Sequence, residues 1–431
     1  MAQKSPDRVV IINDRSAAIG GASNLSILLR RLLQERNVPV TFFAGDIANP
    51  DAPDADVVNL NRTPLLEQSR LSAFVGGLYN RAAYTALRSF IRSSDTPQTI
   101  YHVHGWSKIL SPAIFRALEE VRERVVLHAH DYFLVCPNGG FVNYPASAVC
   151  GLAPMSARCL ATQCDKHGFH QKMWRSARHV VRQTLFDIRS RPANIVLVHD
   201  GMRRYFERAG VSKDRITVVR NPFEPFLQTP AEPEKSRDFF FIGRLEPEKG
   251  FEDAARAARQ AGVKLHVIGE GAGRRLLERA YPEVVLHGWK RREEIAGLVR
   301  TARAVVVSSR VPEPFGLAAL EALGSGIPVI LPSEALLSDE IVKAGCGLSF
   351  RAGDVAALTS AMATLASNDE AAGRMGRTGF AEARRLGNTP QEWGDALVEL
   401  YSDLINKASC TPDRDEYPAR HHIGSGRPHA A

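Results

Sequence analysis

A chain of 431 residues with a net charge of +8, 44% hydrophobic and 24% charged residues is long enough for two globular domains. It contains no apolar run of about 18 residues, which excludes a membrane-spanning helix, and its apolar N-terminal stretch is too short for a signal peptide, so we expect a cytoplasmic protein. Six cysteines do not suggest a disulfide scaffold in a chain of this size, while the basic charge alone fits nucleic acid, anionic lipid or a phosphate-bearing substrate.

The first half of the chain alternates short β-branched or aromatic runs with stretches of helical period. This pattern is typical of an α/β protein in which helices cover both faces of a parallel sheet. A helix is expected over 23–35, where leucines recur on one face. The expected strands of this half are 8–12, 39–44, 56–60, 99–103, 125–129 and 194–198.

The pattern stops at 223–237, whose prolines and mixed charges are typical of a linker. Beyond it, the expected strands are 238–242, 264–268, 284–286, 304–308 and 328–331. We therefore predict two Rossmann-like βαβ domains facing each other across a cleft, with a ligand at the carboxyl ends of the strands. The predicted domains are 1–222 and 238–408, with the last helix packing back on the first domain, followed by a disordered tail at 409–431.

The first motif that indicates chemistry is GRLEPEKG at 243–250, between an expected strand and an expected helix. Its glycines let a ligand approach the backbone closely. Arg244 supplies a planar fork of donors and Lys249 a point charge, which together beside a helix N-terminus suit a diphosphate. A solvated turn with idle charges is the alternative interpretation.

The second motif is EPFGLAALEALGSGIPVI, which begins at Glu313. If a helix begins near Gly316, Glu313 lies in the preceding loop and Glu321 about one turn inside the helix, so that both face a ligand at its N-terminus. The free amides of Gly316 and Leu317 would then face a phosphate. Alternatively, Glu321 lies on an exposed helical face.

Gly20 and Gly21 follow the first expected strand and precede the helix over 23–35. A diglycine at this position brings backbone amides toward a phosphate, although many βα turns contain glycine without binding anything. The glycines of 269–273 lack the spacing of a dinucleotide fingerprint, which argues against an NAD enzyme.

The motifs GRLEPEKG and EPFGLAALEALGSGIPVI, in this order, resemble glycosyltransferase family 4, whose members are retaining enzymes of the GT-B fold. The resemblance covers most of 8–405 and is strongest over 239–331. It implies that Arg244 and Lys249 bind the diphosphate of a nucleotide-sugar donor. It also implies donor-site roles for residues of the second motif and the diglycine, with Glu313 on the sugar hydroxyls, Glu321 on the ribose hydroxyls, and Phe315, Gly316, Leu317, Gly20 and Gly21 lining the site.

The resemblance further places a histidine near the reacting sugar, and His130 matches that position. By sequence alone His128 is an equally good candidate, and His102 and His104 add to the alternatives; a structural role is the usual one for a histidine that ends a buried strand. His130 and Glu313 are the predicted catalytic residues. The scheme requires no metal or other cofactor besides the GDP- or UDP-linked donor.

Four cysteines, Cys136, Cys150, Cys159 and Cys164, lie within about thirty residues, so a structural zinc site or a disulfide is weighed against reduced thiols. The spacings are not those of a zinc ribbon. The segment 166–191 then carries seven basic residues against one acid, Asp187. On a helical wheel, one face carries Lys172, Arg175, His179 and Arg182. Such a face could contact an anionic inner membrane leaflet, and a packed surface helix with solvated charges is an equally good interpretation.

The sequence therefore predicts a hexosyltransferase of mannose or glucose type that acts on a glycan or lipid-linked acceptor in polysaccharide or lipopolysaccharide biosynthesis. A nucleotide-sugar epimerase of the same fold is the alternative. A nucleic-acid-binding protein is not favoured, because no basic sheet with interleaved aromatic residues and no recognised binding motif is present.

Overall fold

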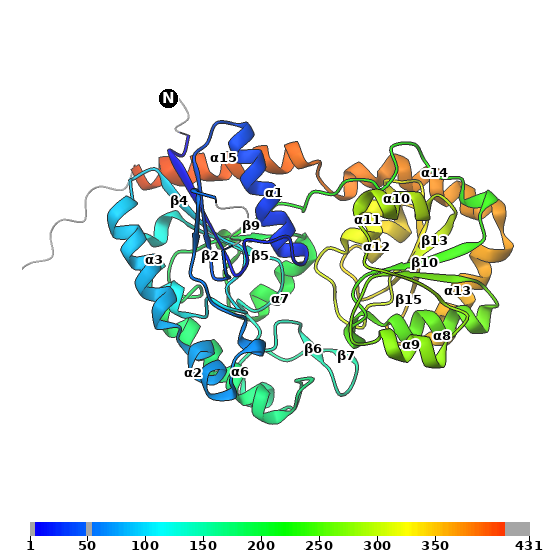
Figure 1. The fold of residues 1–431 in the computed structure, drawn as a ribbon, viewed down its shortest axis with the longest axis horizontal. Helices are drawn as coiled ribbons and strands as arrows, with labels where there is room; N and C mark the ends of the chain where they lie inside the picture. Colours follow the sequence, from blue (N-terminus) through cyan, green and yellow to red (C-terminus); the bar gives the residue numbers. More distant parts are fainter. Residues whose placement is uncertain (1–4, 49–53, 410–431) are drawn as a thin grey trace, which may run out of the picture.

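The computed structural model describes residues 5–48 and 54–409 of the chain. The predicted tail, apart from its first residue, lies outside the described residues. Two parallel sheets with helices on both faces stand side by side, which confirms the predicted GT-B arrangement of two Rossmann-like units (Figure 1). None of the described helices combines the length and apolar composition that crossing a membrane needs.

The first sheet has seven parallel strands in the order β3-β2-β1-β4-β5-β8-β9. The chain therefore begins at the centre of the sheet and adds strands first on one side and then on the other, as doubly wound folds do. The strands are β1 Arg8–Asn13, β2 Val40–Ala44, β3 Val57–Asn59, β4 Thr99–Val103, β5 Val125–Ala129, β8 Asn194–Leu197 and β9 Ile216–Val218.

The second sheet has six parallel strands in the order β12-β11-β10-β13-β14-β15. A short antiparallel hairpin, β6 Val142–Asn143 with β7 Ala148–Val149, stands apart from both sheets. The strands of the second sheet are β10 Asp238–Ile242, β11 Leu265–Ile268, β12 Val285–Gly288, β13 Ala302–Val306, β14 Val329–Pro332 and β15 Gly347–Phe350.

Helices follow most strands. Those of the first half are α1 Gly21–Glu35, α2 Arg70–Leu78, α3 Arg81–Ser94, α4 Ala113–Leu118, α5 Ala157–Ala161, α6 Phe169–Leu185 and α7 Arg203–Arg208. Those of the second half are α8 Phe251–Ala261, α9 Arg274–Ala280, α10 Arg292–Val299, α11 Leu317–Leu323, α12 Ser338–Lys343, α13 Val355–Ser367, α14 Asp369–Leu386 and α15 Pro390–Ser409.

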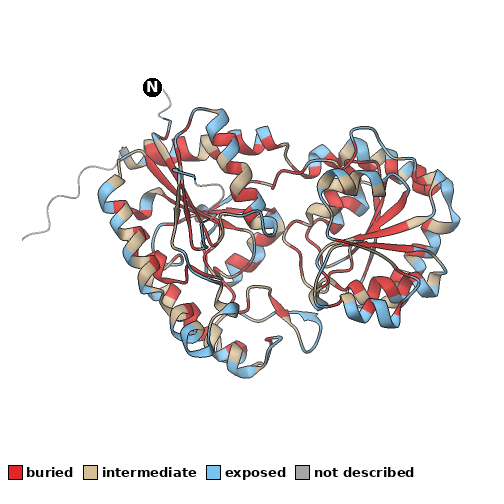
Figure 2. Ribbon diagram, viewed as in Figure 1, coloured by how far each residue is buried: buried red, intermediate tan, exposed pale blue. Residues whose placement is uncertain are grey.

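The strands are apolar on both faces because helices cover both faces (Figure 2). In β1, Val9 and Ile11 pack into a cluster with leucines of α1 and with α15. The alternate residues Val10 and Ile12 pack into a second cluster with α3 and α4. The period of two in a strand thus supplies both layers of the first half from one continuous apolar run.

The last helix, α15, packs on the first sheet although it follows the last helix of the second half (Figure 1). Its buried side chains Trp393, Leu397 and Tyr401 recur every four residues and pack against α1 and the strands below. The chain therefore crosses between the halves twice, once after β9 and once between α14 and α15. At the crossing, Phe223 N donates to Asn388 O at 3.0 Å and Asn388 Nδ2 donates to Arg220 O at 2.6 Å.

Two sheet strands, β9 and β15, were not expected from the sequence, and β13 begins two residues earlier than predicted. The early start includes Arg303, a residue type that a strand pattern places outside a core. In the structure its guanidinium is fully buried and donates to Leu365 O at 2.6 Å and Pro233 O at 2.9 Å. A buried cation is tolerated when its donors have partners of this kind.

The predicted orientation of the basic segment is wrong. Lys172, His179 and Arg182 of α6 face the interior and are buried. Arg182 donates to Phe186 O and Leu134 O at 3.0 and 2.8 Å. Backbone carbonyls of neighbouring loops thus stabilise a basic inward face, and the outward face of the helix is left with apolar residues.

We expect Trp393→Ala to lower the free energy of unfolding by about 3–5 kcal/mol, because it removes a fully buried indole that joins α15 to the first sheet. Urea denaturation followed by circular dichroism measures the change. The matched control is Trp289→Ala, since that indole is 70% exposed and its removal should change stability by at most about 0.5 kcal/mol. Equal losses in the two variants would contradict the packing described for α15.

Candidate donor-binding and transfer site

A cleft of about 440 Å³ lies between the two halves, and the loops at the carboxyl ends of strands from both sheets line it. From the first half come Gly21, His130 and Asp131, which follow β1 and β5. From the second half come Arg244 and Glu313. The structure therefore brings most of the predicted site residues to one place, where open α/β sheets bind ligands.

The turn after β10 is held by a glycine and a serine. Gly250 has a φ of 64° and ends the turn that carries Lys249; a Cβ placed on it would lie 1.9 Å from Ser308 O. Ser308 Oγ in turn donates to Lys249 O and Gly250 O at 3.1 and 2.8 Å. These contacts fix the direction in which the Lys249 side chain leaves the backbone.

Lys249 and Glu313 form an ion pair inside the cleft. Ser309 Oγ also donates to Glu313 Oε1, at 2.8 Å. Burial by itself raises the pKa of the Glu313 carboxyl, but the Lys249 ammonium and the Ser309 hydroxyl hold it below the usual value for glutamate. Glu313 is therefore an ionised acceptor at neutral pH, one that is suited to hydroxyl donors.

Arg244 is exposed and makes no hydrogen bond or ion pair with any of the described residues. Its charge nevertheless acts on the carboxyls of both Glu313 and Glu248, whose pKa values it helps to lower. An unpaired guanidinium at the rim of a cleft is a ready partner for a diphosphate, because its planar fork matches two phosphate oxygens.

The second motif begins its helix where the sequence predicted. Gly316, with a φ of 69°, precedes α11, and Phe315, Gly316 and Leu317 line the cleft. Glu321 lies one turn into α11 and pairs with Arg292 at 2.8 Å, outside the residues that line the cleft. Burial raises the pKa of the Glu321 carboxyl despite that pairing. Its assignment to ribose hydroxyls remains a prediction.

On the opposite wall, Gly20 precedes α1 and Gly21 is its first residue. A Cβ placed on either glycine would meet nothing within 4 Å, so no neighbouring atom excludes a side chain at either position. His130 Nε2 lies 2.9 Å from His104 Nδ1, and burial lowers the pKa of His130 to about 3. His130 thus presents a neutral ring to the cleft, whereas His128 and His102 are buried behind it.

The cleft residues that sequence reasoning missed include Asp131, Tyr144 and Glu248. Asp131 borders the open cleft, and desolvation by the surrounding protein raises the pKa of its carboxyl to about 6. Glu248 of the second half pairs with Lys166 of the first at 3.2 Å, which closes one side of the cleft. The position of Asp131 directly after His130 was the one available signal.

The four clustered cysteines are free thiols and, among the described residues, do not gather as a set of metal ligands. The Lys172 ammonium lies between two of them, 3.4 Å from Cys159 Sγ and 3.3 Å from Cys164 Sγ. Its positive charge would repel a zinc ion at that place. The structure favours reduced thiols over the alternative zinc site, and Cys136 donates to Asn138 Oδ1 at 3.1 Å.

Solved structures share this architecture. The chain resembles sucrose-phosphate synthase from Thermosynechococcus elongatus with a TM-score of 0.70, at 18% identity and with 93% of this chain and 100% of that chain covered. It resembles Anabaena Alr3699/HepE in complex with UDP and glucose with a TM-score of 0.64, at 15% identity, covering 92% and 99% of the two chains. At these identities the likeness establishes the fold, which is that of GT-B glycosyltransferases.

Family comparisons add the class of protein. Residues 19–225 match Glycosyltransferase Family 4 and residues 223–381 match Glycosyl transferases group 1. The two matches adjoin and together cover most of the chain, which belongs to the family 4 type of glycosyltransferases.

Curated relatives match shorter parts of the chain. A glycogen synthase of Mycobacterium tuberculosis is 29% identical over 270 residues, 58% of this chain and 62% of the relative. A GDP-mannose-dependent alpha-mannosyltransferase of the same species is 34% identical over 114 residues, 26% of this chain and 30% of the relative. The chain thus spans less than two thirds of the length of the curated relatives that it matches.

Arg244→Ala should raise the Kd for UDP or GDP by about 10–100-fold, because a charge-assisted hydrogen bond contributes about 1.5–3 kcal/mol. Isothermal titration calorimetry with each nucleotide measures the change. Arg275→Ala is the matched control, since Arg275 is an exposed arginine on α9 that does not line the cleft. Unchanged nucleotide affinity in Arg244→Ala would show that this guanidinium does not bind the diphosphate.

Proposed function

We propose that the protein transfers a hexose, of glucose or mannose type, from a UDP- or GDP-linked donor to a hydroxyl of a glycan or lipid-linked acceptor, with retention of anomeric configuration. The observation that carries the proposal is the unpaired Arg244 beside the Lys249–Glu313 ion pair, directly across the cleft from His130 and Asp131. Cationic groups on one wall and neutral or acidic groups on the other suit a diphosphate leaving group and a hydroxyl acceptor.

The proposed chemistry is electrostatic on the donor side. As the bond between the sugar and the diphosphate breaks, negative charge grows on the phosphate oxygens, and Arg244, Lys249 and the first amides of α1 and α11 lie where they stabilise it. A diphosphate that draws Lys249 away from Glu313 leaves a buried carboxylate free to accept hydrogen bonds from the sugar hydroxyls. Glu321 is assigned to the ribose by the family resemblance.

On the acceptor side, His130 and Asp131 are two adjacent polar residues of the first half that line the cleft. We assign His130 to the reacting sugar and Asp131 to the incoming hydroxyl. Retention is proposed through displacement on the same face, in which the departing phosphate oxygen takes the proton of the acceptor hydroxyl. The transfer as proposed uses no metal.

The test is a panel of UDP-, GDP- and dTDP-linked hexoses, first in a thermal-shift screen and then in a transfer assay with membrane extract and soluble glycans as acceptors. One donor should stabilise the protein strongly, since a ligand that binds only the folded state raises its stability. Proton NMR of the product reads the anomeric configuration. An epimer formed from the donor alone would favour the epimerase, and no stabilisation by any donor would contradict the proposal.

Glu313→Gln and His130→Ala should each lower kcat by about 100-fold or more, because each removes a group placed at the reacting sugar. Both should bind free UDP or GDP about as tightly as the unaltered protein, since neither is assigned to the nucleotide. Steady-state kinetics and calorimetry separate the two quantities. Parallel losses of nucleotide affinity and rate would instead indicate a collapsed cleft.

We further propose that the first half rests on an anionic membrane, through a face other than the one the sequence suggested. The outward side of α6 exposes Phe169, Met173 and Val180, and the adjacent α2 exposes Leu71 and Phe74. The two helices contact each other, and Trp174 Nε1 donates to Phe74 O at 3.2 Å. No acid occurs in 68–94 or 166–186, so neither helix brings a negative charge to this apolar surface.

Phe74→Ser combined with Met173→Ser should weaken binding to phosphatidylglycerol-containing liposomes by about 100-fold, as expected when two large apolar side chains no longer enter the interface. Flotation at low and at physiological salt measures the binding. Leu276→Ser combined with Phe380→Ser is the matched control, because these side chains are similarly exposed on the second half. Absence of liposome binding by the unaltered protein at low salt would end this proposal.

A further inference from the structure

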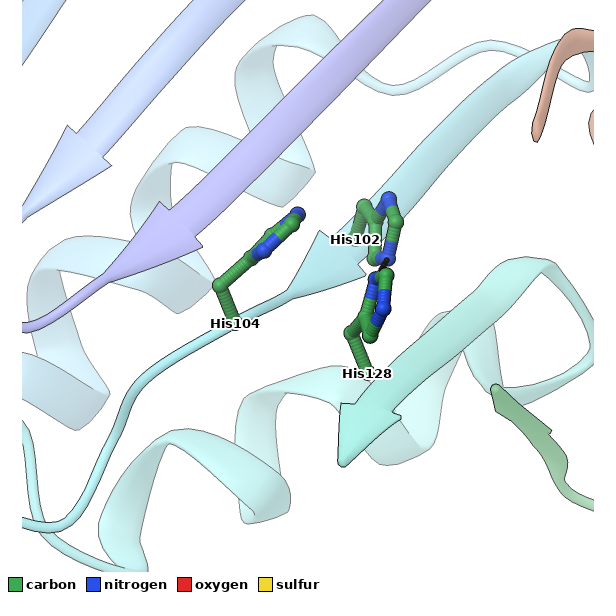
Figure 3. Close-up of side chains that lie close together, drawn as sticks. All are labelled: His102, His104 and His128. Atoms are coloured by element: carbon green, nitrogen blue, oxygen red, sulfur yellow. Dashed lines mark hydrogen bonds between the residues drawn. The ribbon is translucent and has the colours of Figure 1, made fainter. Parts of the chain in front are cut away.

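Three histidines from neighbouring strands meet behind the cleft wall (Figure 3). His102 lies in β4, His104 lies two residues after His102 and just beyond the end of β4, and His128 lies in β5. Because alternate residues of a strand share a face and β4 pairs with β5, the rings converge on one side of the sheet. All three are buried, with 0–5% of their surface exposed.

These rings have few protein partners. His102 Nδ1 lies 2.6 Å from the Tyr401 hydroxyl, and its other ring nitrogen lies 3.2 Å from His128 Nδ1. His104 Nε2 and His128 Nε2 are buried without any hydrogen-bond partner. Among the described residues no carboxylate forms an ion pair or hydrogen bond with any of the three. Buried polar atoms in native proteins usually have partners, so His104 Nε2, the free nitrogen of a ring whose Nδ1 contacts His130, calls for one.

The spacing fits a shared ion. Two nitrogens bound at about 2.0–2.1 Å to one tetrahedral ion lie about 3.3 Å apart, close to the 3.2 Å between His102 Nε2 and His128 Nδ1. One nitrogen from each of the three rings lies within 4.8 Å of the others, and the ring centroids are 4.3–5.2 Å apart.

The surroundings also fit. Metal-bound histidines usually hydrogen-bond through their second ring nitrogen, which fixes the ring. Tyr401 of α15 meets His102 in this way, and His130 meets His104 at 2.9 Å. Neutral imidazoles with no carboxylate favour a borderline transition metal over Mg²⁺ or Ca²⁺, which take oxygen ligands.

We propose that His102, His104 and His128 form a binding site for a divalent transition-metal ion of the zinc type. The ion links β4, β5 and, through Tyr401, α15, and it holds His104, which contacts the cleft residue His130. This role is structural and independent of the proposed transfer, which needs no metal. The competing arrangement is a stack of neutral imidazoles hydrogen-bonded only to one another.

The test uses the full chain, produced in zinc-supplemented medium and dialysed against a chelator that strips exposed sites. Elemental analysis by mass spectrometry should find about one zinc per chain, and X-ray absorption should show three nitrogen neighbours at about 2.0–2.1 Å. Replacement by Co²⁺ should give the visible bands of a tetrahedral ion. Less than a tenth of an ion per chain, with no cobalt bands, would leave the imidazole stack as the answer.

The zinc content of His128→Asn should be at least tenfold lower than that of the unaltered protein. The matched control is His266→Asn, because His266 and His287 form a pair 2.9 Å apart on adjacent strands of the second sheet, without a third histidine. Retention of zinc by His128→Asn, or equal loss in the control, overturns the assignment. If His128→Asn does not fold, the absorption spectrum of the unaltered protein decides, since it reports three imidazoles around one ion or none.

Discussion

Much of this structure depends on how the two crossings of the chain are tied together. Asn388 of the second crossing exchanges hydrogen bonds with Asn221 and Phe223 of the first, and buried apolar residues of both halves pack into one cluster. Beside it, Glu340 of α12 accepts from Arg220 at 2.9 and 3.0 Å and lies 2.8 Å from His199 Nε2 of the first half. These contacts hold the two sheets so that loops from both line the same cleft.

That facing arrangement divides the chemistry of the cleft between the halves. The second half supplies cations and a buried carboxylate from loops held rigidly by Gly250 and Ser308. The first half supplies His130 and Asp131 from the end of β5. Because each wall is built on a separate sheet, a small change at the crossings alters the distance between the walls without disturbing the geometry within either one. Lys166 and Glu248 form one of the ion pairs that join the two halves.

The sequence predicted best the features that depend on residues close together in the chain. The two glycine-containing turns of the second half, and the strands on which they stand, are local patterns, and the structure has them where they were expected. Arg182 was misjudged because a carbonyl of a distant segment, Leu134 O, accepts from it, and periodicity assumes that charges face water. Glu321 was placed beside the ligand by helix geometry and by the family resemblance, and its partner Arg292 comes from α10, which the motif does not include.

The return of α15 to the first sheet also bears on how the chain is made. Trp393, Leu397 and Tyr401 cover strands that are synthesised hundreds of residues earlier. Domains usually fold as the ribosome releases them, from the N-terminal end onward. In this protein one apolar face of the first sheet stays uncovered until the second half has been translated. Only then can α15 pack on it. The N-terminal half is therefore the first to appear and the last to be completed, and a nascent chain carries that uncovered surface for most of its synthesis.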